Sequence, residues 1–231
     1  MKVVGVDGCP GGWVAVCWDV TEGAIHPRIH SSLVALLSRY QDAQAFGVDI
    51  PIGLSGTGTR TCDVAARRLL GRGRSSSVFL APHPDILLAP TYQEAVAWSR
   101  SKIQKGVSQQ TYAIFAKIAE ANATITRELQ DRVFEVHPEV SFWALAAEAM
   151  VHPKNHLAGY LERKSWLEDG MGVVIPDRTE AFKLARPAKP DDILDATVAA
   201  WTARRVADGV AGRLPEEPET DTKGLRMEIV Y

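Results

Sequence analysis

The sequence lacks the features of a disulfide-stabilised protein and of a membrane-spanning protein. Its 231 residues include three cysteines, an odd number without regular spacing, which indicates a reducing cytosol. No apolar run reaches the roughly 18 residues that a membrane-spanning helix needs. Residues Met1–Asp7 are typical of a β-strand and not of the apolar segment of a signal peptide. We therefore expect a cytoplasmic protein that does not use a membrane as a partner.

The sequence also lacks a strong net charge and a cluster of cysteine and histidine. The formal net charge is −2, which gives no general attraction for polyanions. Cys9 and Cys17 have no second Cys or His pair near them, so a structural zinc site is not expected. The hydrophobic fraction of 46% and the charged fraction of 23% are typical of a globular protein with a full core.

Local charge differs from this overall balance. Arginines are frequent between residues 60 and 74, and three serines follow them, which indicates a phosphate-contacting surface. The candidate phosphate contacts are Arg60, Arg67, Arg74 and Ser75, with Lys117 as a further candidate. Salt bridges with Asp63 and Glu94 on a solvated helix face are the alternative explanation for these arginines.

The first part of the chain predicts the order strand–strand–strand–helix–strand. The expected elements are strands at 2–7, 13–18 and 25–30, a helix at 33–40 and a strand at 45–49. Glycines and a proline at 8–12 make the first turn. Pro27 is typical of an edge strand, and Ser31 or Ser32 is suited to cap the helix.

The composition changes between residues 55 and 130, where glycines and arginines are followed by helical patterns. We interpret this segment as a mostly helical insertion in a single α/β domain that spans residues 1–231. The expected elements are helices at 92–105, 108–130, 139–150, 160–168 and 191–207 and strands at 132–136 and 225–231. The acidic residues 216–219 predict a solvated linker, and no internal repeat is present.

Five acidic residues occupy positions where a carboxylate can turn inward. Asp7 and Asp49 end apolar strands, Glu135 follows Val133 and Phe134, and Asp192 and Asp195 lie in the first turns of the last helix. Carboxylates at the ends of apolar strands are costly to desolvate unless positive charge lies among them. A divalent metal site explains all five, and clustered carboxylates suit Mg²⁺ or Mn²⁺.

Each acid also has a simpler explanation. Aspartates at positions such as 7 and 49 readily cap turns with their own side chains. His137 or Glu139 is an alternative functional group to Glu135. Acids at a helix start favour the helix dipole, which accounts for Asp192 more easily than for Asp195.

Taken together, the two strand-terminal aspartates and the late Asp-x-x-Asp helix resemble the pattern of the RNase H-like fold. The whole chain further resembles the uncharacterised-domain family DUF429, a family of predicted RNase H-like nucleases. The resemblance rests on the segments 5–13, 48–54, 60–67, 74–79, 135–139, 191–196 and 224–229. It implies a five-stranded mixed sheet flanked by helices, with carboxylates from the first strand, the fourth strand and a late helix around two ions.

The resemblance to nucleases of this type implies a specific role for each candidate residue. Asp7 would bridge two ions about 3.5–4 Å apart that activate water and stabilise the leaving oxygen. Asp49, Glu135 and either Asp192 or Asp195 would complete the metal ligands. Arg60, Arg67, Arg74 and Lys117 would contact phosphates of the nucleic acid that flank the cleaved bond.

Two other functions share part of this pattern. An actin-like or sugar-kinase-like phosphotransferase has a similar opening, but such enzymes usually repeat it, and no second Asp-Gly hairpin follows residue 130. A non-catalytic nucleic-acid-binding module on an RNase H-like scaffold would be expected to lose acids from the set. All of the acids are present here.

Overall fold

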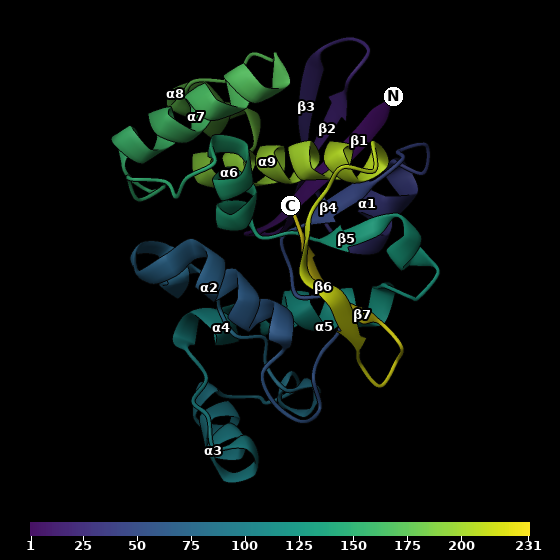
Figure 1. Ribbon diagram of the computed structural model, residues 1–231, viewed down its shortest axis with the longest axis vertical. Coiled ribbons are helices and arrows are strands. Elements are labelled where there is room, and N and C mark those ends of the chain that lie inside the picture. Colours follow the sequence, from purple (N-terminus) through teal and green to yellow (C-terminus); the bar gives the residue numbers. More distant parts are fainter.

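The computed structural model describes residues 1–231, and a five-stranded mixed sheet lies at its centre (Figure 1). Its strands are β1 (Lys2–Cys9), β2 (Gly12–Asp19), β3 (Ala24–His30), β4 (Phe46–Val48) and β5 (Val133–Glu135). The strand order is β3-β2-β1-β4-β5. β1, β2 and β3 pair antiparallel, whereas β4 and β5 run parallel to β1. The mixed α/β sheet implied by the resemblance is therefore confirmed.

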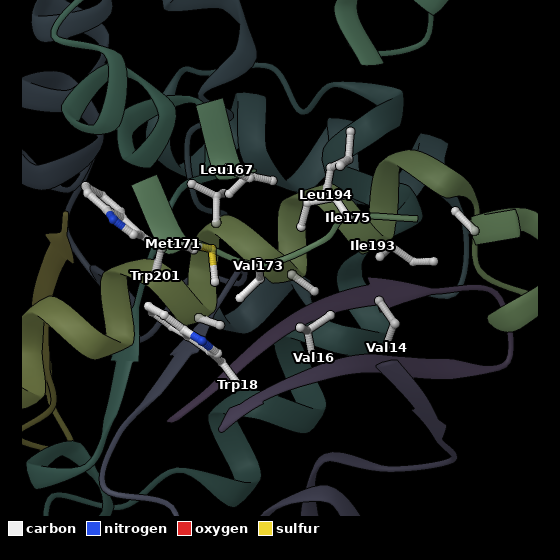
Figure 2. Packing of buried hydrophobic residues seen from close by; sticks show 14 of the residues in the cluster. Val14, Val16, Trp18, Leu167, Met171, Val173, Ile175, Ile193, Leu194 and Trp201 are labelled. Carbon is white, nitrogen blue, oxygen red and sulfur yellow. The ribbon is translucent and has the colours of Figure 1, made fainter. Parts of the chain in front are cut away.

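Helices cover both faces of the sheet because its strands alternate two apolar faces. Val14, Val16 and Trp18 of β2 pack against α9 (Pro190–Ala207) and its neighbours, as Figure 2 shows. The intervening residues of β2 pack on the opposite side with α1 (Leu33–Arg39) and α5 (Phe115–Thr124). The hydroxyl of Ser32 caps α1 as expected, accepting from the N–H of Ala35 at 3.2 Å.

Helices fill the segment between β4 and β5, where the insertion was predicted. They are α2 (Thr61–Arg74), α3 (Tyr92–Ile103), α4 (Gln109–Ala113) and α5, with short 3₁₀ turns at Ser75–Ser77, Pro84–Ile86 and Leu129–Asp131. Figure 1 shows α2, α3 and α4 together, away from β2 and β3. Ile86, Ala95 and Phe115 nevertheless share a hydrophobic cluster with Val4 and Val6 of the sheet. The insertion thus packs directly on the central strands.

Three more helices accompany α9 on the other face of the sheet. They are α6 (Pro138–Ala146), α7 (Leu157–Met171) and α8 (Arg178–Leu184). Leu167 and Met171 of α7 approach α9 close to Leu194 (Figure 2). No helix of the structure is both long enough and apolar enough to cross a membrane.

The chain ends in a separate two-stranded hairpin of β6 (Arg213–Thr220) and β7 (Arg226–Val230). The prediction of a solvated linker at residues 216–219 is wrong, because these residues belong to β6. β6 is largely exposed and pairs only with β7. Because little of the strand is buried, its acidic sequence lacks the alternation of apolar and polar residues that predicts a strand. Val230 also forms a parallel bridge with Val136, which places the hairpin beside β5.

Candidate metal centre

Asp7 and Asp49 lie side by side because β1 and β4 are parallel neighbours in register. Val6 pairs with Val48, and the N–H of Asp49 donates to the carbonyl oxygen of Val6 at 2.8 Å. Val6 and Val48 belong to the cluster under α1 and α5. Since successive side chains of a strand alternate, Asp7 and Asp49 point to the other face, where α9 lies.

Two glycines bring α9 down onto this face. Gly5 and Gly47 are register partners in β1 and β4, two residues before the aspartates. A Cβ atom at Gly5 would lie 1.8 Å from the carbonyl oxygen of Ala196, and one at Gly47 would lie 2.4 Å from that of Ala199. The helix therefore rests directly on the strand backbones, and Asp195, next to Ala196, reaches the two aspartates.

The three aspartates form a compact group that could hold a metal ion. One carboxylate oxygen from each of Asp7, Asp49 and Asp195 lies within 4.8 Å of the others. Asp195 is fully buried, whereas Asp7 and Asp49 are partly exposed. Lys154 donates to Oδ2 of Asp195, and Oδ1 of Asp195 is buried without a hydrogen-bond partner. A single ammonium thus faces three carboxyl groups.

The electrostatics of this group reflect an excess of negative charge. Burial raises the pKa of Asp7 well above its usual range, and the charges of Asp49 and Asp195 raise it further. Burial, followed by the charge of Asp195, raises the pKa of Asp49 to about 8. The charge of Asp195 in turn raises the pKa of Lys154. The unpaired oxygen and the all-oxygen donor set fit a hard divalent cation such as Mg²⁺ or Mn²⁺.

The structure does not bring Glu135 into this group. Its register partner in β4 is Val48, so its side chain leaves the sheet on the face opposite Asp49. Its two carboxylate oxygens each accept a 2.7 Å hydrogen bond from Arg60, and the N–H of Ile52 donates to Oε2 at 2.6 Å. The hydrogen bonds of both oxygens are already provided by the protein.

Arg60 is likewise not placed to contact a phosphate. Its side chain is only 1% exposed and also binds Asp63, with a distance of 2.5 Å between Nη2 and Oδ1. Burial alone lowers the pKa of Arg60, but the charges of Asp63 and Glu135 raise it well above its usual value. The alternative of a salt bridge with Asp63 therefore describes Arg60, although this salt bridge lies inside the protein.

Asp192 and Asp195, which the sequence could not separate, have different surroundings. The carboxylate of Asp192 accepts from the N–H of Lys189 at 2.8 Å and caps α9. Burial, with a smaller contribution from the charges of Asp191 and Asp195, raises the pKa of Asp192 to about 6, although the hydrogen bond from Lys189 acts in the opposite direction. Asp195 is the member of this pair that joins Asp7 and Asp49.

A cavity of about 380 Å³ contains the aspartate group and some of the predicted phosphate contacts. Arg74 lines it, bonded through Nε to the carbonyl of Met150 at 2.7 Å, and its Nη2 is buried without a partner. Lys117 lines it as well, donating to the carbonyl of Gly12, with its ammonium 4.6 Å from the ring centre of Trp13. Neither Arg67 nor Ser75 lines this cavity.

The cavity also contains residues that the sequence did not identify or left as alternatives. Lys154 lies in the loop between α6 and α7, where no pattern distinguishes it. His137 and Glu139 come shortly after the end of β5. Their position after a strand end was the only sequence feature that marked them as candidate functional residues. Nδ1 of His137 and Oε2 of Glu139 are buried without hydrogen-bond partners, although Oε2 lies 4.0 Å from Nε of Arg74, and Oε1 of Glu139 accepts from the buried Arg163. Burial lowers the pKa of His137.

The comparison with protein families gives one result that covers most of the chain. A family model described as a protein of unknown function (DUF429) matches residues 5–220. The chain belongs to the DUF429 family. The match includes the strand ends at Asp7 and Asp49 and the whole of α9, so the aspartate group lies within the DUF429 region. Neither the curated proteins nor the solved structures provide a match.

Proposed function

We propose that this protein is a nuclease that hydrolyses phosphodiester bonds of nucleic acid with Mg²⁺ or Mn²⁺. The observation that carries the proposal is the convergence of Asp7, Asp49 and Asp195 inside a cavity. Their positions at two parallel strand ends and on a late helix are those that the resemblance to RNase H-like nucleases implied. Lys154, which pairs with Asp195, provides the one ammonium that faces these three carboxyl groups.

In this proposal the three aspartates hold the metal. A bound divalent ion would activate a water molecule and stabilise the charge that develops on the leaving oxygen. Asp7 is the proposed shared ligand, as the resemblance to RNase H-like nucleases implies, and one of its carboxylate oxygens lies within 4.8 Å of those of Asp49 and Asp195. Asp7 and Asp49 must release their protons when the metal binds, because the ionised carboxylate is the metal ligand and the protonated acid is not.

Other residues of the cavity position the substrate. The free Nη2 of Arg74 and the ammonium of Lys117 are suited to phosphate oxygens. Lys154 neutralises Asp195 before metal binds, and its side chain is 43% exposed, so it is free to turn toward a phosphate afterwards. Glu135 and Arg60 are assigned a positioning role, because together they bind the backbone of Ile52 close to Asp49.

The test combines metal binding with cleavage. Mn²⁺ binding is measured by calorimetry, and cleavage is measured on labelled single-stranded and duplex DNA, RNA and hybrids with Mg²⁺ or Mn²⁺. We expect wild type to bind Mn²⁺ and to cleave at least one substrate, and Asp7→Asn to lose both properties. Asp42→Asn is the control, because Asp42 is 59% exposed and pairs only with Lys2.

The outcomes separate the alternatives. A wild type that binds neither metal nor nucleic acid contradicts the proposal. A wild type that binds nucleic acid but cleaves none of the substrates supports the non-catalytic binding module instead. Transfer of phosphate from a nucleotide to a small molecule would support the phosphotransferase.

A further inference from the structure

A second cavity adjoins the one that holds the aspartates, and the mechanism proposed above does not use it. It has a volume of about 260 Å³ and is built entirely from the insertion. Residues of α2, α3 and α4 line it together with the loops between these helices. Phe79 lines both cavities, so the two meet at this side chain.

Phe79 presents an aromatic surface at this junction. Its side chain is 38% exposed, although its neighbour Val78 is buried at 1%. The carbonyl oxygen of Val78 accepts a hydrogen bond from Nε of Arg67 at 2.9 Å. The backbone is thus anchored on one side of Phe79, while its ring remains available to a ligand.

The charge of the second cavity is opposite to that of the first. Arg67 and Lys105 line it, and no aspartate or glutamate does. Arg67 donates from Nε to the carbonyl of Val78, and Lys105 donates to the hydroxyl of Thr59, so each is bonded to a neutral oxygen. Neither positive charge is neutralised by a carboxylate within the cavity. Hydroxyls of Ser76 and Ser108 add further hydrogen-bonding groups, and the whole suits an anion such as phosphate.

We propose that the two cavities form a continuous path for single-stranded nucleic acid. The substrate class of this proposal rests on the proposed function. The cleaved phosphodiester would lie at the aspartates, and the neighbouring nucleotide would lie in the second cavity. Arg67 and Lys105 bind the phosphate of that nucleotide, and Phe79 stacks on a base between the cavities. A paired base inside a duplex has no face free for such stacking, so the path selects single strands.

The test measures binding without cleavage, in EDTA, by fluorescence anisotropy with labelled thymidine oligonucleotides of increasing length. We expect affinity to rise from the mononucleotide to longer strands and to exceed that for a duplex. Phe79→Ala should weaken single-strand binding by roughly tenfold, within the range of one base–aromatic stack. Phe79→Leu, which keeps the apolar bulk, should weaken it almost as much.

Two matched controls make the result specific. Phe182→Ala should have no effect, because Phe182 is 45% exposed and lies on α8, outside both cavities. Arg67→Met should reduce the salt dependence of binding by about one phosphate contact. Mn²⁺ affinity should stay unchanged in Phe79→Ala, since Phe79 is no metal ligand.

The inference is overturned if Phe79→Ala binds as tightly as Phe182→Ala, or if duplex and single strand bind equally. A mononucleotide that binds as tightly as a long strand would also overturn it. These results are independent of catalysis. Cleavage that is insensitive to Phe79 removes this inference alone, whereas Phe79-dependent binding without cleavage removes only the nuclease.

Discussion

Two groups of charged residues flank the ends of the central strands, one buried and the other partly exposed, and their hydrogen bonds are satisfied to different degrees. On one face Arg60 binds both oxygens of Glu135 and both oxygens of Asp63. On the other face Lys154 binds one oxygen of Asp195 and leaves the other without a partner. Both groups border the same cavity.

The difference indicates which group is structural and which is a site. Buried charges are stable when partners satisfy every oxygen and every N–H, as they do around Arg60. Three carboxyl groups facing one ammonium remain incompletely compensated, and burial together with the neighbouring negative charges raises the pKa values of Asp7 and Asp49. The acidic residues alone placed Glu135 in the same metal site as the aspartates, and the partners of Glu135 remove it from that site.

The largest expected effect comes from breaking the satisfied group. Arg60→Met leaves Glu135 and Asp63 buried without a counter-charge, which should destabilise the fold by about 3–5 kcal/mol. Urea denaturation measures this loss. Arg204→Met is the control, because the side chains of Arg204 and its partner Asp208 are 29% and 40% exposed, and it should cost less than about 1 kcal/mol. Equal losses for the two variants would show that the Arg60 group has no structural role.

Changing the unsatisfied group should affect activity and leave the fold intact. Asp7→Asn should lower the cleavage rate by more than about 100-fold, the upper limit seen for residues that only orient metal ligands. Its unfolding free energy should stay the same or rise, because repulsion with Asp49 and Asp195 is relieved. Parallel cleavage and denaturation assays test both statements, and a destabilised Asp7→Asn would contradict the assignment of this group as a site.

The raised pKa of Asp49 predicts how stability depends on pH without metal. Its pKa rises from an ordinary value of 3.8 to about 8, so the folded state retains a proton that the unfolded state releases. This contribution to stability is complete below pH 3.8 and is lost as the pH rises through 8. Asp49→Asn should remove that loss and gain at least about 1 kcal/mol at high pH, the value of one pKa unit. Thermal denaturation in EDTA at several pH values measures it.

Saturating Mn²⁺ should reverse the sign of this dependence. Metal binds the deprotonated carboxylates, so stabilisation by Mn²⁺ should grow as the pH rises toward 8. The same pH series with Mn²⁺ in place of EDTA provides the comparison. An identical profile in both conditions would argue against a metal at Asp49.

The smallest expected effect concerns Lys154. Its ammonium competes with a cation for Asp195, so Lys154→Met should raise Mn²⁺ affinity by roughly threefold to tenfold, or about 1 kcal/mol. Calorimetry measures the change. Lys2→Met is matched in exposure, since the side chains of Lys2 and Lys154 are 45% and 43% exposed, and it should leave the affinity unchanged.

Local sequence patterns predicted the strands that end at Asp7 and Asp49 and offered Asp195 as a candidate together with Asp192, whereas the mixed sheet was implied by the family resemblance. Asp7 and Asp49 end apolar strands, and a strand end is visible in the few residues around it. The choice between Asp192 and Asp195 depended on which carboxylate caps the helix, and both lie near its start. In the structure Asp192 caps the helix, and the contact of α9 with Gly5 and Gly47 brings Asp195 to the strand ends.

Long-range pairing explains the remaining differences. Arg60 looked like a surface arginine, but its partner Glu135 lies 75 residues further along the chain. Glu135 ends a strand of three residues, which is too short to show from sequence which face a side chain takes. Lys154 belongs to a loop, where sequence gives no periodicity at all.

The direct contact between α9 and the glycines of β1 and β4 also sets the size of ion that the aspartates accept. The distance between the backbone of α9 at Asp195 and the two strand ends is fixed by backbone packed on backbone. Mg²⁺ requires ligands at about 2.0–2.1 Å in near-ideal geometry, whereas Ca²⁺ accepts about 2.3–2.6 Å and variable geometry. A methyl group introduced by Gly47→Ala would raise the helix from the strands and widen the ring of oxygens. In the proposed metal site, the two glycines would therefore act as a spacer that limits the radius of the cation.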